Sequence, residues 1–241
     1  NERTLKSASA QQFEQHAGRA FDLDCRHIEV RDRAHRARCH RVEQHSARAR
    51  LSCTVRGRHT LLRLAAGRRL IRYDARGFGL SDPNPTAVTT AAHADDLEAV
   101  LDALAVDECD LFAAGDAGFA AIEFCARASG RVGRLILWGS YANRDALLNS
   151  PKIKSMHALW DQDWLQYTEL AIRTVLGWKH EDRASQLADF YRAAASPESV
   201  RNVVGALYGV DLTVLLPSVR VPTLVIALHD GWIDVRDEAR R

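Results

Sequence analysis

Residues 110–122 read DLFAAGDAGFAAI, and they carry the clearest indication of the architecture of this chain. The run from Asp110 to Ala113 is short and apolar, which predicts a strand. The small residues after it predict a sharp turn. The segment from Gly118 to Ala128 then predicts a helix whose small side chains allow close packing on a sheet. A strand, a tight turn and a helix in this order indicate an α/β architecture.

The same alternation continues on both sides of this stretch. A helix is expected from Ala91 to Leu104, where apolar residues recur at helical spacing: Leu97, Val100, Leu101 and Leu104. Apolar runs predict further strands at Arg69–Tyr73, Leu135–Trp138 and Val221–Ala227. Such alternation predicts crossover connections and a mostly parallel sheet. The aromatic-rich region between Tyr141 and Asp211 predicts helices, which either pack as a core of their own or form a cap over the strand ends.

The first 60 residues have a different character. They are rich in arginine, histidine and cysteine and show little apolar periodicity, so we expect a basic, weakly structured segment over residues 1–60. Only Phe21–Val30 and Leu51–Val55 suit short strands. A basic nucleic-acid arm is one alternative, although interleaved aromatic residues are lacking. A zinc site is another, although the paired spacings of structural zinc modules are lacking; its donors would be Cys25, His27, His35, Cys39, His40 and His45. Translation of a GC-rich coding sequence in a shifted frame would also give this composition.

Charge and composition restrict the possible partners. A formal net charge of +2 over 241 residues favours neither nucleic acid nor a membrane surface as partner. No apolar run approaches the roughly 20 residues that span a bilayer, and no secretory signal is visible. The five cysteines are an odd number without a compact framework, which predicts a reducing, cytoplasmic location. Asn1 is not a start methionine, so a processed or truncated chain stays open.

Residues 73–82 read YDARGFGLSD and carry a resemblance to a known family. The stretch resembles the Y-D-x-R-G-x-G-x-S-D loop of α/β-hydrolases, and the order of elements that follows is also similar. The closest branch occurs alone or fused to bacterial transcription regulators and nucleotide cyclases. The resemblance implies an α/β-hydrolase-like domain over residues 61–241, with a mostly parallel sheet flanked by helices and a helical cap at about residues 143–210. It further implies hydrolysis of the esterase type without metal or organic cofactor, and a small-molecule ester or apolar ligand as partner; a homodimer stays open.

The resemblance places the family's catalytic positions on residues that do not match them. Gly115 occupies the position of the nucleophilic serine in the G-x-S-x-G elbow. The acid of the family's H-G-x-x-D pattern would fall near Asp230, which stands one residue early, and His229 beside it is a candidate stand-in base. The family histidine would lie beyond a further strand, past Arg241.

A shift of one residue gives a second alignment. Residues 114–118 then resemble the small-x-D-x-G elbow of haloalkane dehalogenases and epoxide hydrolases, with Asp116 as nucleophile. The competing interpretation is that Asp116 is an exposed acid near a helix N-terminus, where the helix dipole favours it. Ser81 and Ser140 are hydroxyls near expected strand ends, and turn or cap roles are expected for them.

Three hypotheses about function follow. The chain is a cofactor-free esterase-type hydrolase with weak or absent activity, a non-catalytic ligand-binding or regulatory domain of the same fold, or an enzyme with an aspartate nucleophile. A truncated or frame-shifted copy of an active enzyme would explain the unusual composition at both ends.

Overall fold

The computed structural model describes residues 68–149, 151–176 and 181–227, together with three short strands near the N-terminus. The described residues fall in two compact units. One contains residues 42–45 and 68–73, and the other contains residues 30–31, 38–39 and 74–227 with the gaps just given. Each unit is described by itself.

The first unit contains an antiparallel pair of strands. β3 (Val42–His45) pairs with β4 (Leu70–Tyr73), and Val42 lies opposite Tyr73 in the register. The strand predicted at Arg69–Tyr73 is therefore confirmed. The strands predicted at Phe21–Val30 and Leu51–Val55 lie outside the described residues, except for Val30.

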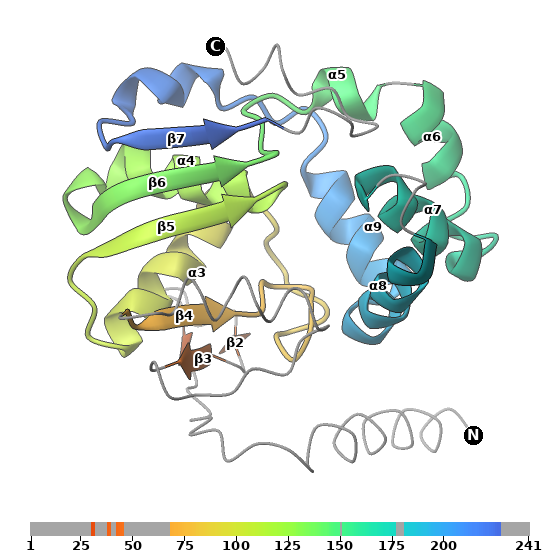
Figure 1. Cartoon of the computed structure of the whole chain (residues 1–241), viewed down its shortest axis with the longest axis horizontal. Coiled ribbons are helices and arrows are strands. Elements are labelled where there is room, and N and C mark those ends of the chain that lie inside the picture. Colours follow the sequence, from red (N-terminus) through yellow and green to blue (C-terminus); the bar gives the residue numbers. More distant parts are fainter. Residues whose placement is uncertain are drawn as a thin grey trace. The chain divides into compact units, whose positions relative to one another are not determined.

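The second unit is built on a parallel sheet. β5 (Cys109–Ala114), β6 (Val132–Trp138) and β7 (Thr223–Ile226) are hydrogen-bonded in the order β5-β6-β7, and all run in the same direction (Figure 1). The predicted parallel sheet is thus confirmed. A separate antiparallel pair in this unit joins β1 (Val30–Arg31) to β2 (Arg38–Cys39).

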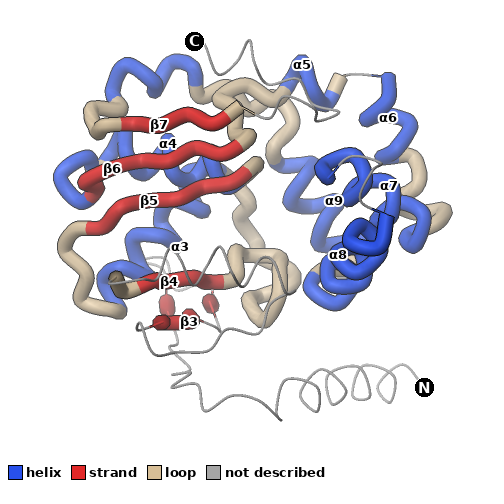
Figure 2. Tube along the Cα trace, viewed as in Figure 1, coloured by secondary structure: helices blue, strands red, loops and turns tan. Residues whose placement is uncertain are grey.

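Two helices connect and cover these strands. α3 (Thr90–Ala103) begins at Thr89, whose side chain accepts a hydrogen bond from the Ala92 N–H at 3.0 Å, a regular N-cap. α4 (Ala117–Arg127) follows β5 directly and lies behind the sheet in Figure 2. Both helices bury one apolar face, and the largest buried side chains of α4 are Phe119, Ile122 and Phe124. The helices predicted around residues 91–104 and 118–128 are confirmed within one residue at each end.

A helical insertion separates β6 from β7. It consists of α5 (Asp145–Leu148), α6 (Pro151–His157), α7 (Trp164–Leu176), α8 (Glu181–Ala194) and α9 (Pro197–Ala206), and a 3-10 helix, η2 (Thr213–Ser218), leads back to the sheet. The insertion has its own core, formed by Leu148, Ile153, Met156, Tyr167, Val200 and Val204. Helices α6 to α9 lie beyond the carboxyl ends of β5 and β6 (Figure 1). The helical character predicted for this region is therefore confirmed.

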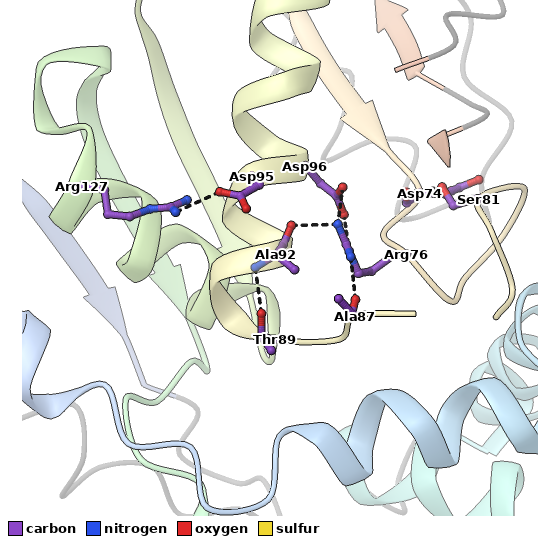
Figure 3. Close-up of polar contacts among 9 residues, drawn as sticks. All are labelled: Asp74, Arg76, Ser81, Ala87, Thr89, Ala92, Asp95, Asp96 and Arg127. Atoms are coloured by element: carbon purple, nitrogen blue, oxygen red, sulfur yellow. Dashed lines mark hydrogen bonds and ion pairs between the residues drawn. The ribbon is translucent and has the colours of Figure 1, made fainter. Parts of the chain in front are cut away.

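The loop after β4 is fixed by a buried arginine (Figure 3). The Arg76 guanidinium donates to both carboxylate oxygens of Asp96 on α3, each at 2.7 Å, and to the carbonyl oxygens of Ala87 and Ala92 at 2.6 and 3.0 Å. Each donated bond offsets part of the cost of burying this charge. The arginine of the quoted loop motif is therefore a structural residue that joins the loop to α3.

The remaining polar residues of this loop hold its backbone. The Asp74 carboxylate accepts a hydrogen bond from the Leu80 N–H at 3.0 Å, and the Ser81 hydroxyl donates to the Asp74 carbonyl oxygen at 2.6 Å. Gly79 has a φ of +60°, which favours glycine, and its N–H donates to the Ala194 carbonyl oxygen at the end of α8 at 2.7 Å. Ser81 thus has the turn role expected for it. The loop also fixes the end of α8 through this bond.

No helix within residues 68–149, 151–176 and 181–227 is both long and apolar enough to cross a membrane. The same residues contain no group of three or more potential metal-ligating side chains. Of the zinc donors considered above, Cys39 and His45 lie in strands described by their backbone alone, and the other four lie outside the described residues.

Candidate functional site

The turn between β5 and α4 has the backbone of a nucleophile elbow. Gly115 stands at its tip with a φ of +56°, and its N–H donates to the Trp138 carbonyl oxygen at 3.0 Å. The Gly118 N–H closes the turn on the Gly115 carbonyl oxygen, also at 3.0 Å. A Cβ atom placed on Gly115 would meet no heavy atom of the described residues within 4 Å. Among these residues, open space therefore lies where the side chain of residue 115 would project.

Gly118, in contrast, has no room for a side chain. A Cβ atom there would lie 2.5 Å from the Cβ atom of Ser140 and 2.7 Å from its Oγ. Ser140 is buried, and its hydroxyl lies 3.4 Å from the Ala113 carbonyl oxygen. The second glycine of the motif is needed because the N-terminus of α4 packs against Ser140, two residues after the end of β6. Ser140 belongs to this packing contact.

Asp116 is held through both of its carboxylate oxygens. Oδ1 accepts a hydrogen bond from the Tyr141 hydroxyl, and Oδ2 forms an ion pair with Arg144 Nη2 at 3.0 Å. The Asp116 side chain is 42% exposed, whereas that of Arg144 is 8% exposed. Asp116 is therefore an exposed acid at the start of α4, as one interpretation of the sequence expected, but it is anchored by two residues that the sequence analysis did not select.

The segment that carries Tyr141 and Arg144 is fixed by the chain that returns from the insertion. Asn143 forms an isolated bridge with Asp211, and its Nδ2 donates to Asp211 Oδ2 at 2.9 Å. The Leu212 N–H donates to the Ala142 carbonyl oxygen at 2.8 Å. Tyr141 also packs edge-to-face on Phe119 of α4, with ring centroids 5.4 Å apart. The tyrosine and the arginine are thus placed at the carboxyl edge of the sheet before any ligand binds.

Electrostatics keep Tyr141 in its protonated form. Burial raises the pKa of its phenol well above the usual range, and the negative charge of Asp116 raises it further. A phenol that stays protonated at neutral pH remains a hydrogen-bond donor. Tyr141 and Arg144 together neutralise and orient the Asp116 carboxylate.

Arg144 has more donors than partners. Its Nη2 takes part in the ion pair, but Nε and Nη1 are buried and have no hydrogen-bond partner among the described residues. Its positive charge also helps to lower the pKa of His157, after the larger effect of burial, to about 4. Burial raises the pKa values of Tyr167 and Tyr191, and the Arg144 charge acts on both in the opposite direction. The Arg144 charge therefore acts on ionisable side chains of the insertion.

Those side chains form an aromatic cluster, defined here as His157, Trp160, Trp164, Tyr167 and Tyr191. The His157 ring stacks on Trp160 with centroids 4.2 Å apart, and its Nδ1 lies 2.7 Å from the Tyr208 hydroxyl oxygen. Trp164 stacks on Tyr167 at 5.3 Å and faces Tyr191 at 6.1 Å. Stacked and tilted rings at these distances attract one another beyond the effect of burial alone.

One further histidine lies in the field of Asp116. His93, in the first turn of α3, has a lowered pKa, mainly because it is buried and then because of the charge of Arg76; Asp96 and Asp116 act in the opposite sense. It is therefore neutral at physiological pH. No hydrogen bond joins His93 to Asp116 among the described residues.

The structure brings only part of the predicted site together. Gly115 and Asp116 stand at the elbow, whereas His229 and Asp230 lie outside the described residues. Sequence reasoning missed Tyr141, Arg144 and His157. The first two directly follow a predicted strand, and the rule that ligands bind at the carboxyl ends of strands could have identified them.

The chain also matches a known family. A family model described as the alpha/beta hydrolase fold matches residues 58–220, more than half of the chain. The chain therefore belongs to the α/β-hydrolase family.

Solved structures agree on the fold. A hydrolase from Pseudomonas aeruginosa PA01 is 20% identical with a TM-score of 0.70, covering 92% of this chain and 85% of that one. The esterase EaEST from Exiguobacterium antarcticum is 19% identical with a TM-score of 0.68, and the match covers 84% of this chain and 81% of that one. A thermophilic esterase from Thermogutta terrifontis is 25% identical with a TM-score of 0.59, and the match covers 72% of this chain and 66% of that one. A search of curated proteins gives no significant match.

Proposed function

We propose that this protein binds a small-molecule ligand at the carboxyl edge of its sheet and forms no acyl-enzyme at the elbow. The observation that carries the proposal is the elbow itself. Gly115 has the left-handed φ of +56° at the tip of the turn and space above it, but glycine has no atom that can attack a carbonyl carbon.

The state of Asp116 supports the same proposal. A carboxylate nucleophile needs a free oxygen lone pair aimed at the electrophilic carbon. Here one oxygen accepts a hydrogen bond from Tyr141 and the other pairs with Arg144, and both contacts withdraw negative charge from the carboxylate. These contacts favour a positioning role for Asp116 over a nucleophilic one.

The surroundings of the elbow suit a binding site. Ligands of open α/β sheets bind beyond the carboxyl ends of the strands. In this chain that edge carries an aspartate, a protonated tyrosine and a buried arginine, and the aromatic cluster of the insertion lies within the field of the arginine. We propose that the insertion acts as a cap over this ligand. In the described part of the chain, Cys109 and Cys125 are free thiols, which supports action in a reducing compartment such as the cytosol.

Turnover measurements test the proposal directly. The full chain and its Asp116→Ala and Asp230→Ala variants would be assayed with short p-nitrophenyl esters and a haloalkane, and thermal unfolding would be recorded with each compound. We expect no turnover above the buffer rate. Any compound that binds the folded state should raise the unfolding temperature in a concentration-dependent way.

Two outcomes would contradict the proposal. Turnover that is abolished by Asp116→Ala would make Asp116 a nucleophile. Turnover that survives this variant would show that another group carries an esterase activity. That second function is the main competitor, because a hydrolase and two esterases share the fold.

A further inference from the structure

The buried arginine behind the elbow is the least satisfied polar group of the site. The Arg144 side chain is more than nine-tenths buried, and its Nη2 forms the ion pair with Asp116. Nε carries one N–H bond and Nη1 carries two. These three donors have no acceptor among the described residues.

Leaving such donors unpaired is costly. A buried donor without a partner has lost its hydrogen bonds to water without replacing them, and the cost is greater when the group is charged. Native structures satisfy almost all of these groups with protein, water or ligand. Three unpaired N–H bonds on one cation at the carboxyl edge of a sheet therefore indicate an acceptor that arrives with the ligand.

The charges around Arg144 define which acceptor fits. Asp116 already supplies one negative charge, whereas the other ionisable groups on which the Arg144 charge acts are neutral: Tyr141, His157, Tyr167 and Tyr191. A second monoanion is well matched by the planar guanidinium, which presents donors in the geometry of a carboxylate. A dianion such as phosphate would meet stronger repulsion from Asp116.

The aromatic cluster defines the rest of the ligand. Trp160, Trp164 and Tyr191 pack against the core of the insertion, and the Arg144 charge acts on Tyr191. An aromatic or aliphatic body attached to the charged group would pack against these rings. Free acetate would fill only the charged half of such a site.

We propose that Arg144 binds the carboxylate of a small organic acid whose apolar part packs against the aromatic cluster. This inference rests on the proposed function, because it names the ligand class of the same site. Asp116 stays paired with Nη2, and the ligand carboxylate accepts from Nη1, because Nε and Nη1 lie at different edges of the guanidinium and cannot hold one carboxylate together.

Pairs of acids and amides test this inference with the full chain. Phenylacetate and hexanoate would be compared with phenylacetamide and hexanamide, which keep the body and lose the charge, and with acetate and inorganic phosphate. Binding would be measured by calorimetry and by the shift in unfolding temperature. We expect at least one of the two larger acids to bind at least tenfold more tightly than its amide, and more tightly than acetate or phosphate.

Variants then assign the effect to Arg144. Arg144→Met keeps the length of the side chain without its charge and should weaken binding of the acid at least tenfold. Arg134→Met is the matched control, because Arg134 is an exposed arginine on β6 that pairs with Asp110. Where Arg144→Met does not fold, Arg144→Lys keeps a charge without the planar fork and should still weaken binding.

The outcomes separate this inference from the proposed function. Equal binding of acid and amide, or unchanged binding in the arginine variants, would overturn the carboxylate inference and leave a ligand-binding protein. Binding of phosphate alone, or of none of the acids, would overturn it as well. Ester turnover that depends on Asp116, together with binding of the acid that depends on Arg144, would overturn the proposed function and leave the inference intact.

Discussion

Arg76 and Asp96 form a two-bond ion pair that is almost completely buried, with side chains 3% and 10% exposed. The pair joins the loop after β4 to α3, and the Ala87 and Ala92 carbonyl oxygens accept the remaining donated bonds of the arginine. Removing one partner of a buried pair leaves an uncompensated charge, which costs far more than removing a pair exposed to water.

We therefore expect Asp96→Asn to lower the free energy of unfolding by about 3–5 kcal/mol. Asp95→Asn is the matched control, because this neighbouring residue pairs with Arg127 (Figure 3) and both side chains are well exposed. The expected loss in the free energy of unfolding is below about 1 kcal/mol. Urea unfolding of the two variants checks the difference. Equal losses would mean that the Arg76 pair is not buried in solution.

The two glycines of the elbow should respond differently to alanine. In Gly115→Ala the new methyl group projects into open space, but the backbone must keep a left-handed φ. We therefore expect the free energy of unfolding to fall by about 1–2 kcal/mol. In Gly118→Ala the new methyl group clashes with Ser140. We expect the free energy of unfolding to fall by an amount at the upper end of about 1–3 kcal/mol. The Gly118→Ala/Ser140→Gly double variant removes the clash and should recover part of that loss. A double variant that loses the full sum would show that Ser140 is not the obstacle.

The fold could be predicted from the sequence because its signals are local. Apolar runs such as Leu135–Trp138 and the helical spacing of Leu97, Val100 and Leu101 each define an element without reference to the rest of the chain. The site depends on contacts between residues that lie 25 or more positions apart in the sequence. Asp116 was selected from its motif, but its partners Tyr141 and Arg144 are brought to it only by the parallel pairing of β5 with β6. No periodicity in a single sequence predicts such a contact.

The hydrogen bond from Tyr141 to Asp116 gives a prediction at alkaline pH. Because burial and the Asp116 charge raise the pKa of Tyr141, its phenol should stay protonated while ordinary tyrosines ionise near pH 10. Tyr141→Phe should therefore leave unchanged the rise in tyrosinate absorbance from about pH 9 to about pH 11. The same variant should lose about 1.5–3 kcal/mol of stability, because the bond is made to a charged acceptor. Loss of one tyrosinate from that absorbance rise would contradict the assignment.

His157 gives a prediction at acidic pH. Its pKa in the folded chain is about 4, below its ordinary value of 6.5, because burial and then the Arg144 charge disfavour the protonated form. Between these two values the unfolded chain binds a proton that the folded chain does not, so stability falls as the pH falls from about 6.5 towards about 4. His93 has a shift of the same direction, and we therefore compare the wild type with His157→Phe, which keeps a ring against Trp160.

The stability difference between the wild type and His157→Phe should shrink as the pH is lowered through this interval, because only the wild type loses the contribution of this group. Denaturant unfolding at a series of pH values measures the difference. Tyr208→Phe is the control, since it removes the contact with His157 Nδ1 but leaves the imidazole in place. Its stability should keep the pH dependence that His157→Phe loses. A difference between wild type and His157→Phe that stays constant over the interval would mean that His157 titrates alike in the folded and unfolded chains.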